Sequence, residues 1–114
     1  MKLCLVLLIS IRYGEAVTQG PLVLVGGNLQ EDNSEIYDKI VELSGGKGIA
    51  KIGVVTAANG NAESSGAYYV DMFQRYGAAT VYWIPVQESD PGAAFSSETV
   101  GNILQMGGIF FGGG

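Results

Sequence analysis

The sequence predicts an α/β fold in which a parallel β-sheet is flanked by helices. Short apolar runs, typical of strands buried in a sheet, alternate with stretches whose apolar residues recur every three or four positions. The apolar runs end on glycine or other small residues, as strands of such sheets do where they lead into ligand-binding loops. The 114 residues are 47% hydrophobic and 15% charged, which is the composition of a packed domain.

Residues 1–16 have the features of an export signal. Lys2 provides a positive start, residues 3–11 form a short apolar core, and Gly14 and Ala16 are small residues of the kind a signal peptidase accepts. We expect cleavage after Ala16 and a secreted or extracellular protein, with residues 17–114 forming the α/β part. The apolar core is about half as long as a membrane span. The alternative is that residues 3–8 form a buried first strand.

Four strands and three helices are expected after this segment. The strands are predicted at residues 22–25, 51–56, 80–84 and 109–111. The helices are predicted to begin at Asn33 or Ser34, at Glu63, and at Ser96 or Ser97, and to end near residues 43, 75 and 106. Residues 91–92 are expected to be a loop. The first strand is a continuous apolar run, which is typical of a strand buried on both faces.

We expect the four strands to be parallel, with neighbours around the first strand. Their carboxyl ends, near Gly26, Thr56, Val86 and Gly112, should then lie at one edge of the sheet. The chain stops on glycines directly after the fourth strand, where a doubly wound sheet would continue into a covering helix. We therefore expect the chain to be the front part of a domain that is truncated after its fourth strand.

Charge and residue types exclude several classes of function. The net charge is −5 and no basic cluster is present, so we expect neither a nucleic acid nor, after removal of the signal, a membrane as partner. The chain has no histidine, and its only cysteine, Cys4, lies in the predicted signal. We therefore expect no metal and no cofactor, and a Ser-His-acid triad cannot be assembled within this chain. A homodimer remains open.

Two groups of polar residues are interpreted as structural. Asp32, Glu35, Asp38 and Glu42 recur at helical spacing, which is typical of a solvated helix face. Ser64 and Ser65 are interpreted as loop residues before a helix, because no base is available to activate a serine nucleophile.

Candidate binding residues follow the predicted strands. Gly26, Gly27 and Asn28 follow the first strand, but their spacing does not match a dinucleotide-binding turn, which leaves a tight turn or a substrate loop. Thr56 ends the second strand at the same predicted edge. The glycines 112–114 fit two interpretations equally: a turn that needs positive φ, or backbone donors for an oxyanion.

Four blocks in order, at residues 20–28, 52–58, 69–78 and 108–114, resemble the successive blocks of cyanophycinase-like proteins. These proteins group with dipeptidase E among serine peptidases built on a class I glutaminase-like sheet of flavodoxin-like type. The chain departs from the family pattern at Gly112, where threonine is usual, and at Val55, where proline is usual.

The resemblance implies a serine-type peptidase that hydrolyses aspartyl or β-aspartyl peptide bonds, with a peptide or isopeptide as substrate. In this family a glycine pair, here Gly113 and Gly114, follows the strand, so their backbone N–H groups become oxyanion-hole candidates. The nucleophilic serine and the histidine would lie beyond Gly114, so no catalytic residue is expected in this chain. The alternatives are a flavodoxin-type module that binds a flavin or nucleotide, and a non-catalytic pseudoenzyme.

Overall fold

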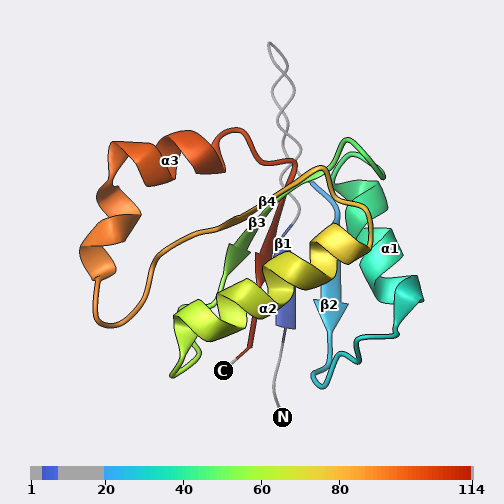
Figure 1. The fold of residues 1–114 in the computed structure, drawn as a ribbon, viewed down its shortest axis with the longest axis horizontal. Helices are drawn as coiled ribbons and strands as arrows, with labels where there is room; N and C mark the ends of the chain where they lie inside the picture. The colour runs from blue at the N-terminus through green and yellow to red at the C-terminus, as the bar shows by residue number, and fades with distance from the viewer. Residues whose placement is uncertain (1–3, 8–19, 114) are drawn as a thin grey trace.

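The computed structural model describes residues 4–7 and 20–113. In this part of the chain, helices surround a five-stranded sheet with the strand order β2-β1-β5-β3-β4 (Figure 1). The strands are β1 (Cys4–Leu7), β2 (Leu22–Val25), β3 (Lys51–Val55), β4 (Thr80–Trp83) and β5 (Gly108–Phe111). The helices are α1 (Ser34–Leu43), α2 (Ala62–Arg75), the 3₁₀-helix η1 (Pro91–Phe95) and α3 (Ser97–Ile103).

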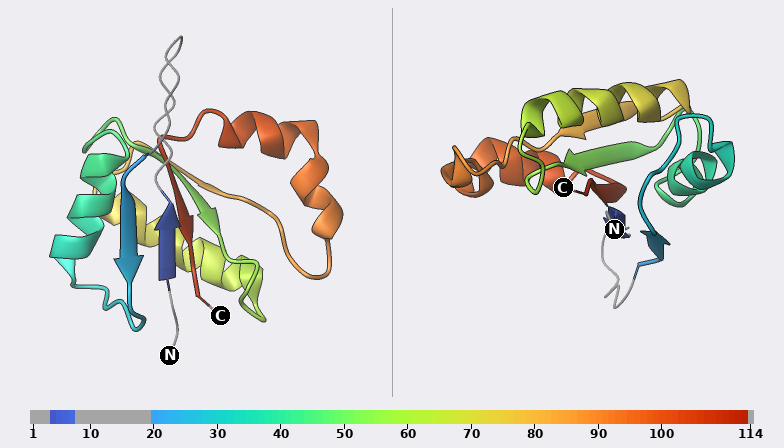
Figure 2. Two further views of the ribbon diagram at one scale, coloured as in Figure 1. Left: turned by 180° about the vertical axis from the view of Figure 1, so that it is seen from behind. Right: turned by 90° about the horizontal axis from the view of Figure 1, so that it is seen from below.

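The strands β2, β5, β3 and β4 run in the same direction. β3 pairs in parallel with β4 on one side and with β5 on the other, so that Ile52 lies opposite Val81 and Gly108. β2 and β5 are each antiparallel to β1, and they therefore share the direction of β3 (Figure 2). The α/β fold is as predicted, and the carboxyl ends of these four strands lie at one edge of the sheet.

The expectation of a purely parallel sheet around the first predicted strand was wrong. β1 lies between β2 and β5 and is antiparallel to both, with Leu5 opposite Leu24 on one side and Phe111 on the other. β2 is therefore an edge strand. Residues 4–7 thus pair as the alternative interpretation of this segment requires, whereas the cleavage site after Ala16 lies outside the described residues. Export remains a prediction.

β2 is buried on one face only, contrary to the prediction from its apolar run. Val25 is 6% exposed and contributes to the core, whereas Leu22 is 53% and Leu24 64% exposed. The reason is that α1 and α2 pack on the same face of the sheet as Val23 and Val25, and β2 lies at the edge. An apolar run alone does not distinguish a doubly covered strand from this arrangement.

The helix starts follow side-chain caps, and two of the three were predicted. The side-chain oxygen of Asn33 accepts a hydrogen bond from the backbone N–H of Ile36, at 3.2 Å, and begins α1. Ser96 accepts one from the N–H of Thr99, at 3.0 Å, and begins α3. These bonds satisfy N–H groups that the first helical turn leaves unpaired. The loop expected at residues 91–92 is instead part of η1, which starts on Pro91.

Two hydrophobic cores lie on opposite faces of the sheet. The larger joins α1, α2 and the sheet through fully buried Tyr37, Phe73 and Phe110. The smaller contains Ile84, Met106 and Ile109 on the other face, with Ile103 of α3 packed against it. The alternation along β5 explains the division, because successive side chains of a strand point to opposite faces.

Gly66 sets the distance between α2 and β4. A Cβ atom built at Gly66 would overlap the indole ring of Trp83, closer than real side chains approach. Trp83 is held in place by a hydrogen bond from its Nε1 to the Thr56 hydroxyl, at 3.0 Å. The indole therefore cannot move aside without losing this bond.

We expect Gly66→Ala to lower the free energy of unfolding by about 1–2 kcal/mol, because overpacking outweighs the gain in helix propensity. Gly101→Ala is the matched control, since Gly101 is also helical and a Cβ there meets no atom within 4 Å. This control should stabilise the protein by about 0.5–1 kcal/mol. Urea unfolding followed by circular dichroism measures both. Equal effects of the two substitutions would contradict the close contact.

Tyr37 is a fully buried tyrosine whose hydroxyl has no hydrogen-bond partner in the described part of the chain. Its ring stacks on Tyr76 with 4.7 Å between centroids and meets Phe73 edge-on. Burial, followed by the electrostatic influence of the neighbouring Tyr68 hydroxyl, raises the pKa of Tyr37 well above its usual range. The folded state therefore favours the neutral phenol.

This shift predicts a loss of stability in alkali. Below the usual tyrosine pKa of 10.0, both states hold the Tyr37 proton, and above it the unfolded chain releases the proton first. The free energy of unfolding should then fall with rising pH by at most about 1.4 kcal/mol per pH unit from this group. Tyr37→Phe should remove this component and leave stability at neutral pH unchanged or higher, since no hydrogen bond is lost. Urea unfolding of the unmodified chain and of Tyr37→Phe from pH 8 to 11 measures this component. An identical pH dependence of the unfolding free energy in the two proteins would contradict the raised pKa of Tyr37.

Candidate functional site

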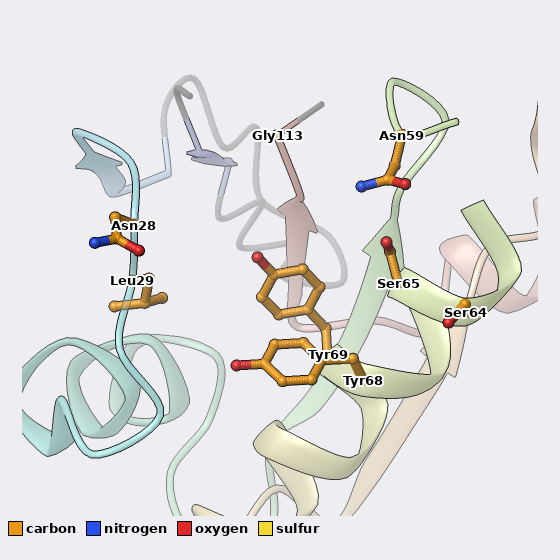
Figure 3. A pocket seen from close by; sticks show the side chains of 8 residues that line it. All are labelled: Asn28, Leu29, Asn59, Ser64, Ser65, Tyr68, Tyr69 and Gly113. Atoms are coloured by element: carbon orange, nitrogen blue, oxygen red, sulfur yellow. The ribbon is translucent and has the colours of Figure 1, made fainter. Parts of the chain in front are cut away.

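A polar pocket of about 300 Å³ lies at the carboxyl edge of the sheet. It is formed by the loop after β2, by the loop after β3 with the first half of α2, and by Gly113, two residues after the end of β5 (Figure 3). The lining residues are Asn28, Leu29, Asn59, Ser64, Ser65, Tyr68, Tyr69 and Gly113. Loops at this edge of an open α/β sheet are the usual place for ligands.

The loop after β2 turns sharply at two residues with left-handed backbone. Gly27 has φ +90° and Asn28 has φ +50°, a conformation that asparagine tolerates better than most residues. The carbonyl of Asn28 accepts a hydrogen bond from Gln30 Nε2, at 3.1 Å. The side chain of Asn28 makes no hydrogen bond to the described part of the chain, so its amide can serve a ligand.

The loop after β3 is held by hydrogen bonds of its own. The backbone N–H of Asn59 donates to the carbonyl of Thr56, at 3.0 Å, and the Asn59 side-chain oxygen accepts from the N–H of Asn61, at 2.9 Å. Asn61 in turn caps α2 by accepting from the N–H of Ser64, at 3.3 Å. Figure 3 shows the Asn59 side chain facing the loop after β2 across the pocket. Its amide nitrogen is the group left for a ligand.

Tyr68 and Tyr69, both in α2, line the pocket. Their rings meet edge to face, with 5.0 Å between centroids, and Tyr69 also packs on Phe110 at 4.6 Å. Tyr68 is 38% exposed. Burial, and then the negative charge of Glu31, raise the pKa of Tyr68 above its usual value, so this phenol is a neutral donor at physiological pH.

The two described glycines after β5 have different roles: Gly112 is required by packing, and Gly113 is accessible from the pocket. The N–H of Gly112 donates to the carbonyl of Val55, at 2.8 Å, and a Cβ there would press on Tyr69 and Thr56 at 3.1 and 3.2 Å. Gly112 is therefore explained by close packing. Gly113 lines the pocket. Gly114, the other predicted oxyanion donor, lies outside the described residues.

The structure brings Asn28 and Gly113 together and leaves the other predicted loop residues off the pocket wall. Gly26 is exposed and Gly27 shapes the turn, but neither lines the pocket. Thr56 is 1% exposed: its hydroxyl donates to the carbonyl of Ala62, at 2.6 Å, and accepts from Trp83 Nε1. Thr56 thus fixes the start of α2 against β4 from below the surface.

Six lining residues were not predicted as binding residues. They are Leu29, Asn59, Ser64, Ser65, Tyr68 and Tyr69. Ser64 and Ser65 lie in α2, as the predicted helix start at Glu63 implies, and their interpretation as loop residues before the helix was wrong. A usable signal was present, since Ser65, Tyr68 and Tyr69 are spaced three and four apart and so share a side of the helix.

No charged side chain lines the pocket in the described part of the chain. The described basic residues are engaged or placed elsewhere: Lys39 pairs with Glu42, Lys47 with Asp38 and Arg75 with Asp71, at 2.7 to 3.2 Å. Lys51 begins β3 and so lies at the opposite edge of the sheet. The described lining residues can therefore offer amide, hydroxyl and backbone groups to a ligand, but no cation.

Residues 4–7 and 20–113 contain no group of three or more potential metal-ligating side chains. In the same residues, no helix has the length and apolar character needed to cross a membrane.

No protein-family model and no solved structure matches the chain.

The buried position of Thr56 predicts a structural phenotype. Thr56→Val keeps the shape but leaves the Trp83 N–H without its acceptor, which should cost about 1–3 kcal/mol of unfolding free energy. Thr80→Val at the exposed start of β4 is the control and should change stability little. Chemical unfolding monitored by Trp83 fluorescence measures both. Unchanged stability together with lost ligand binding would assign Thr56 to the binding site instead.

Proposed function

We propose that the chain forms part of a secreted serine-type hydrolase resembling cyanophycinase, acting on aspartyl or β-aspartyl peptide bonds. The observation that carries the proposal is the pocket at the carboxyl edge, which both Asn28 and Gly113 line. These residues come from two of the sequence blocks that resemble this family. The sequence made the loop of Asn28 a substrate-loop candidate, and the resemblance makes Gly113 an oxyanion-donor candidate.

The residues of the pocket would bind and orient the substrate. Gly113 lines the pocket, and in this proposal its backbone N–H would stabilise negative charge on the carbonyl oxygen under attack. The side-chain amides of Asn28 and Asn59 flank the pocket from two loops and can hold the peptide in place (Figure 3). The nucleophile and its base are not among these residues, since the chain has no histidine to activate Ser64 or Ser65.

The alternative of a flavin or nucleotide module has less support. At about 300 Å³ the pocket is at the lower end of small-molecule sites, and a flavin needs more room. The loop after β2 also lacks the glycine spacing of a phosphate-binding turn.

The second alternative is a pseudoenzyme that retains the pocket. It would share the binding properties described above, so a turnover assay of a longer chain distinguishes a pseudoenzyme from an enzyme.

We expect the 114-residue chain to bind β-aspartyl-arginine without hydrolysing it. An oxyanion donor without nucleophile and base retains only a small part of the rate enhancement. Backbone NMR during titration should show shifts confined to Asn28, Asn59, Tyr68 and Gly113, while a turnover assay should stay at background. Turnover sensitive to a serine-directed inhibitor, and lost in Ser65→Ala, would show that the catalytic machinery lies in α2. Absence of any binding would overturn the proposed function.

A further inference from the structure

We infer that this pocket recognises the uncharged main-chain amide of a peptide, and that it does not read the charge of the aspartyl side chain. The inference rests on the proposed function and specifies which part of the substrate this chain contacts. It follows from the chemistry of the eight lining residues and from the placement of the cations in the described part of the chain.

The groups left for a ligand are neutral and include both donors and acceptors. The Asn28 side chain and the hydroxyls of Ser64 and Ser65 make no hydrogen bonds to the described part of the chain, and Asn59 uses only its side-chain oxygen. A peptide amide has one N–H donor and one carbonyl acceptor, so it needs partners of both kinds. The Asn28 amide supplies both, and the Asn59 amide nitrogen adds a donor.

The electrostatics of the pocket disfavour a carboxylate. Proteins usually bind carboxylates with arginine or lysine, because a charged pair is stronger than a neutral hydrogen bond. Here Lys39, Lys47 and Arg75 are paired with acids, and Lys51 lies at the other edge of the sheet. The negative charge of Glu31 acts on Tyr68 at the pocket wall, and the chain carries a net charge of −5. A carboxylate would therefore enter against the local field.

The left-handed backbone at Asn28 adds a positional argument. Among the described residues Asn28 is the non-glycine residue with positive φ, at +50°. Asparagine tolerates this conformation better than most residues, but it still costs free energy, and such residues cluster at active sites and ligand-binding positions. Glycine would relieve the strain, but it would remove the amide. The arrangement is explained if the Asn28 amide contacts the ligand.

The test compares two peptides of equal length with the full 114-residue chain. N-acetyl-alanyl-alanine amide is neutral, and N-acetyl-aspartyl-alanine amide adds one carboxylate. NMR titration should give dissociation constants for the two peptides that differ by less than about 3-fold and change little in about 0.5 M sodium chloride, because neutral hydrogen bonds are not screened. Aspartyl peptide binding that is about 10-fold tighter and weakens with salt would overturn the inference and leave the proposed function standing. Failure of both peptides to bind would overturn both.

Asn28→Gly isolates the contribution of the amide. This variant retains the left-handed backbone. It should raise the dissociation constant of the neutral peptide about 5-fold, which is the effect of losing one hydrogen bond of ordinary net strength. Gln105→Ala removes a side-chain amide at an exposed position outside the pocket and should leave binding unchanged. Unfolding measurements on both variants separate loss of binding from loss of fold. Equal binding by Asn28→Gly and the unmodified chain would exclude the Asn28 amide as the recognising group and overturn the inference at this residue.

Discussion

The contact between Phe110 of β5 and the aromatic rings of α2 is the interaction on which the rest of the structure depends. Phe110 meets Phe73 with 5.1 Å and Tyr69 with 4.6 Å between ring centroids. Phe73 then meets Tyr37 of α1 at 5.5 Å, so one chain of rings joins both helices to the sheet. Aromatic pairs stabilise a core through their preferred ring arrangements, in addition to the apolar surface that they bury. Because Tyr69 belongs to this chain and also lines the pocket, the core directly fixes one wall of the site.

The periodicity of the sequence predicted the elements, but not which faces they cover. Strand and α-helix ranges from residue 20 onward agree with the structure within a few residues, since caps such as Asn33 and Ser96 are local signals. The exposure of Leu22 and Leu24 depends on where the helices cross the sheet, which is a long-range property. A continuous apolar run has no period from which one covered face could be distinguished from two.

The candidate site was predicted where backbone conformation is encoded locally, and missed where it depends on packing. Asn28 follows a glycine at a strand end, and Gly113 follows an apolar strand; both are visible in the sequence and both line the pocket. Thr56 was equally visible, but its hydroxyl is consumed by Ala62 and Trp83, and Trp83 is 27 residues away. A small polar residue at a strand end can thus face either the ligand or the core, and only the tertiary partner decides.

The position of β1 gives residues 4–7 two uses that exclude each other. In the folded sheet these residues pair with β2 on one side and with β5 on the other. The sequence predicts that the same residues leave with the export signal. A chain without them would have the facing edges of β2 and β5 about 10 Å apart, two strand spacings, with unpaired backbone groups on each. Unpaired edges bind other strands. The unprocessed chain fills this gap with its own N-terminal strand. An exported chain would need either another extended segment in the gap or a direct pairing of β2 with β5. Direct pairing would draw the loop of Asn28 toward Gly113 and narrow the pocket.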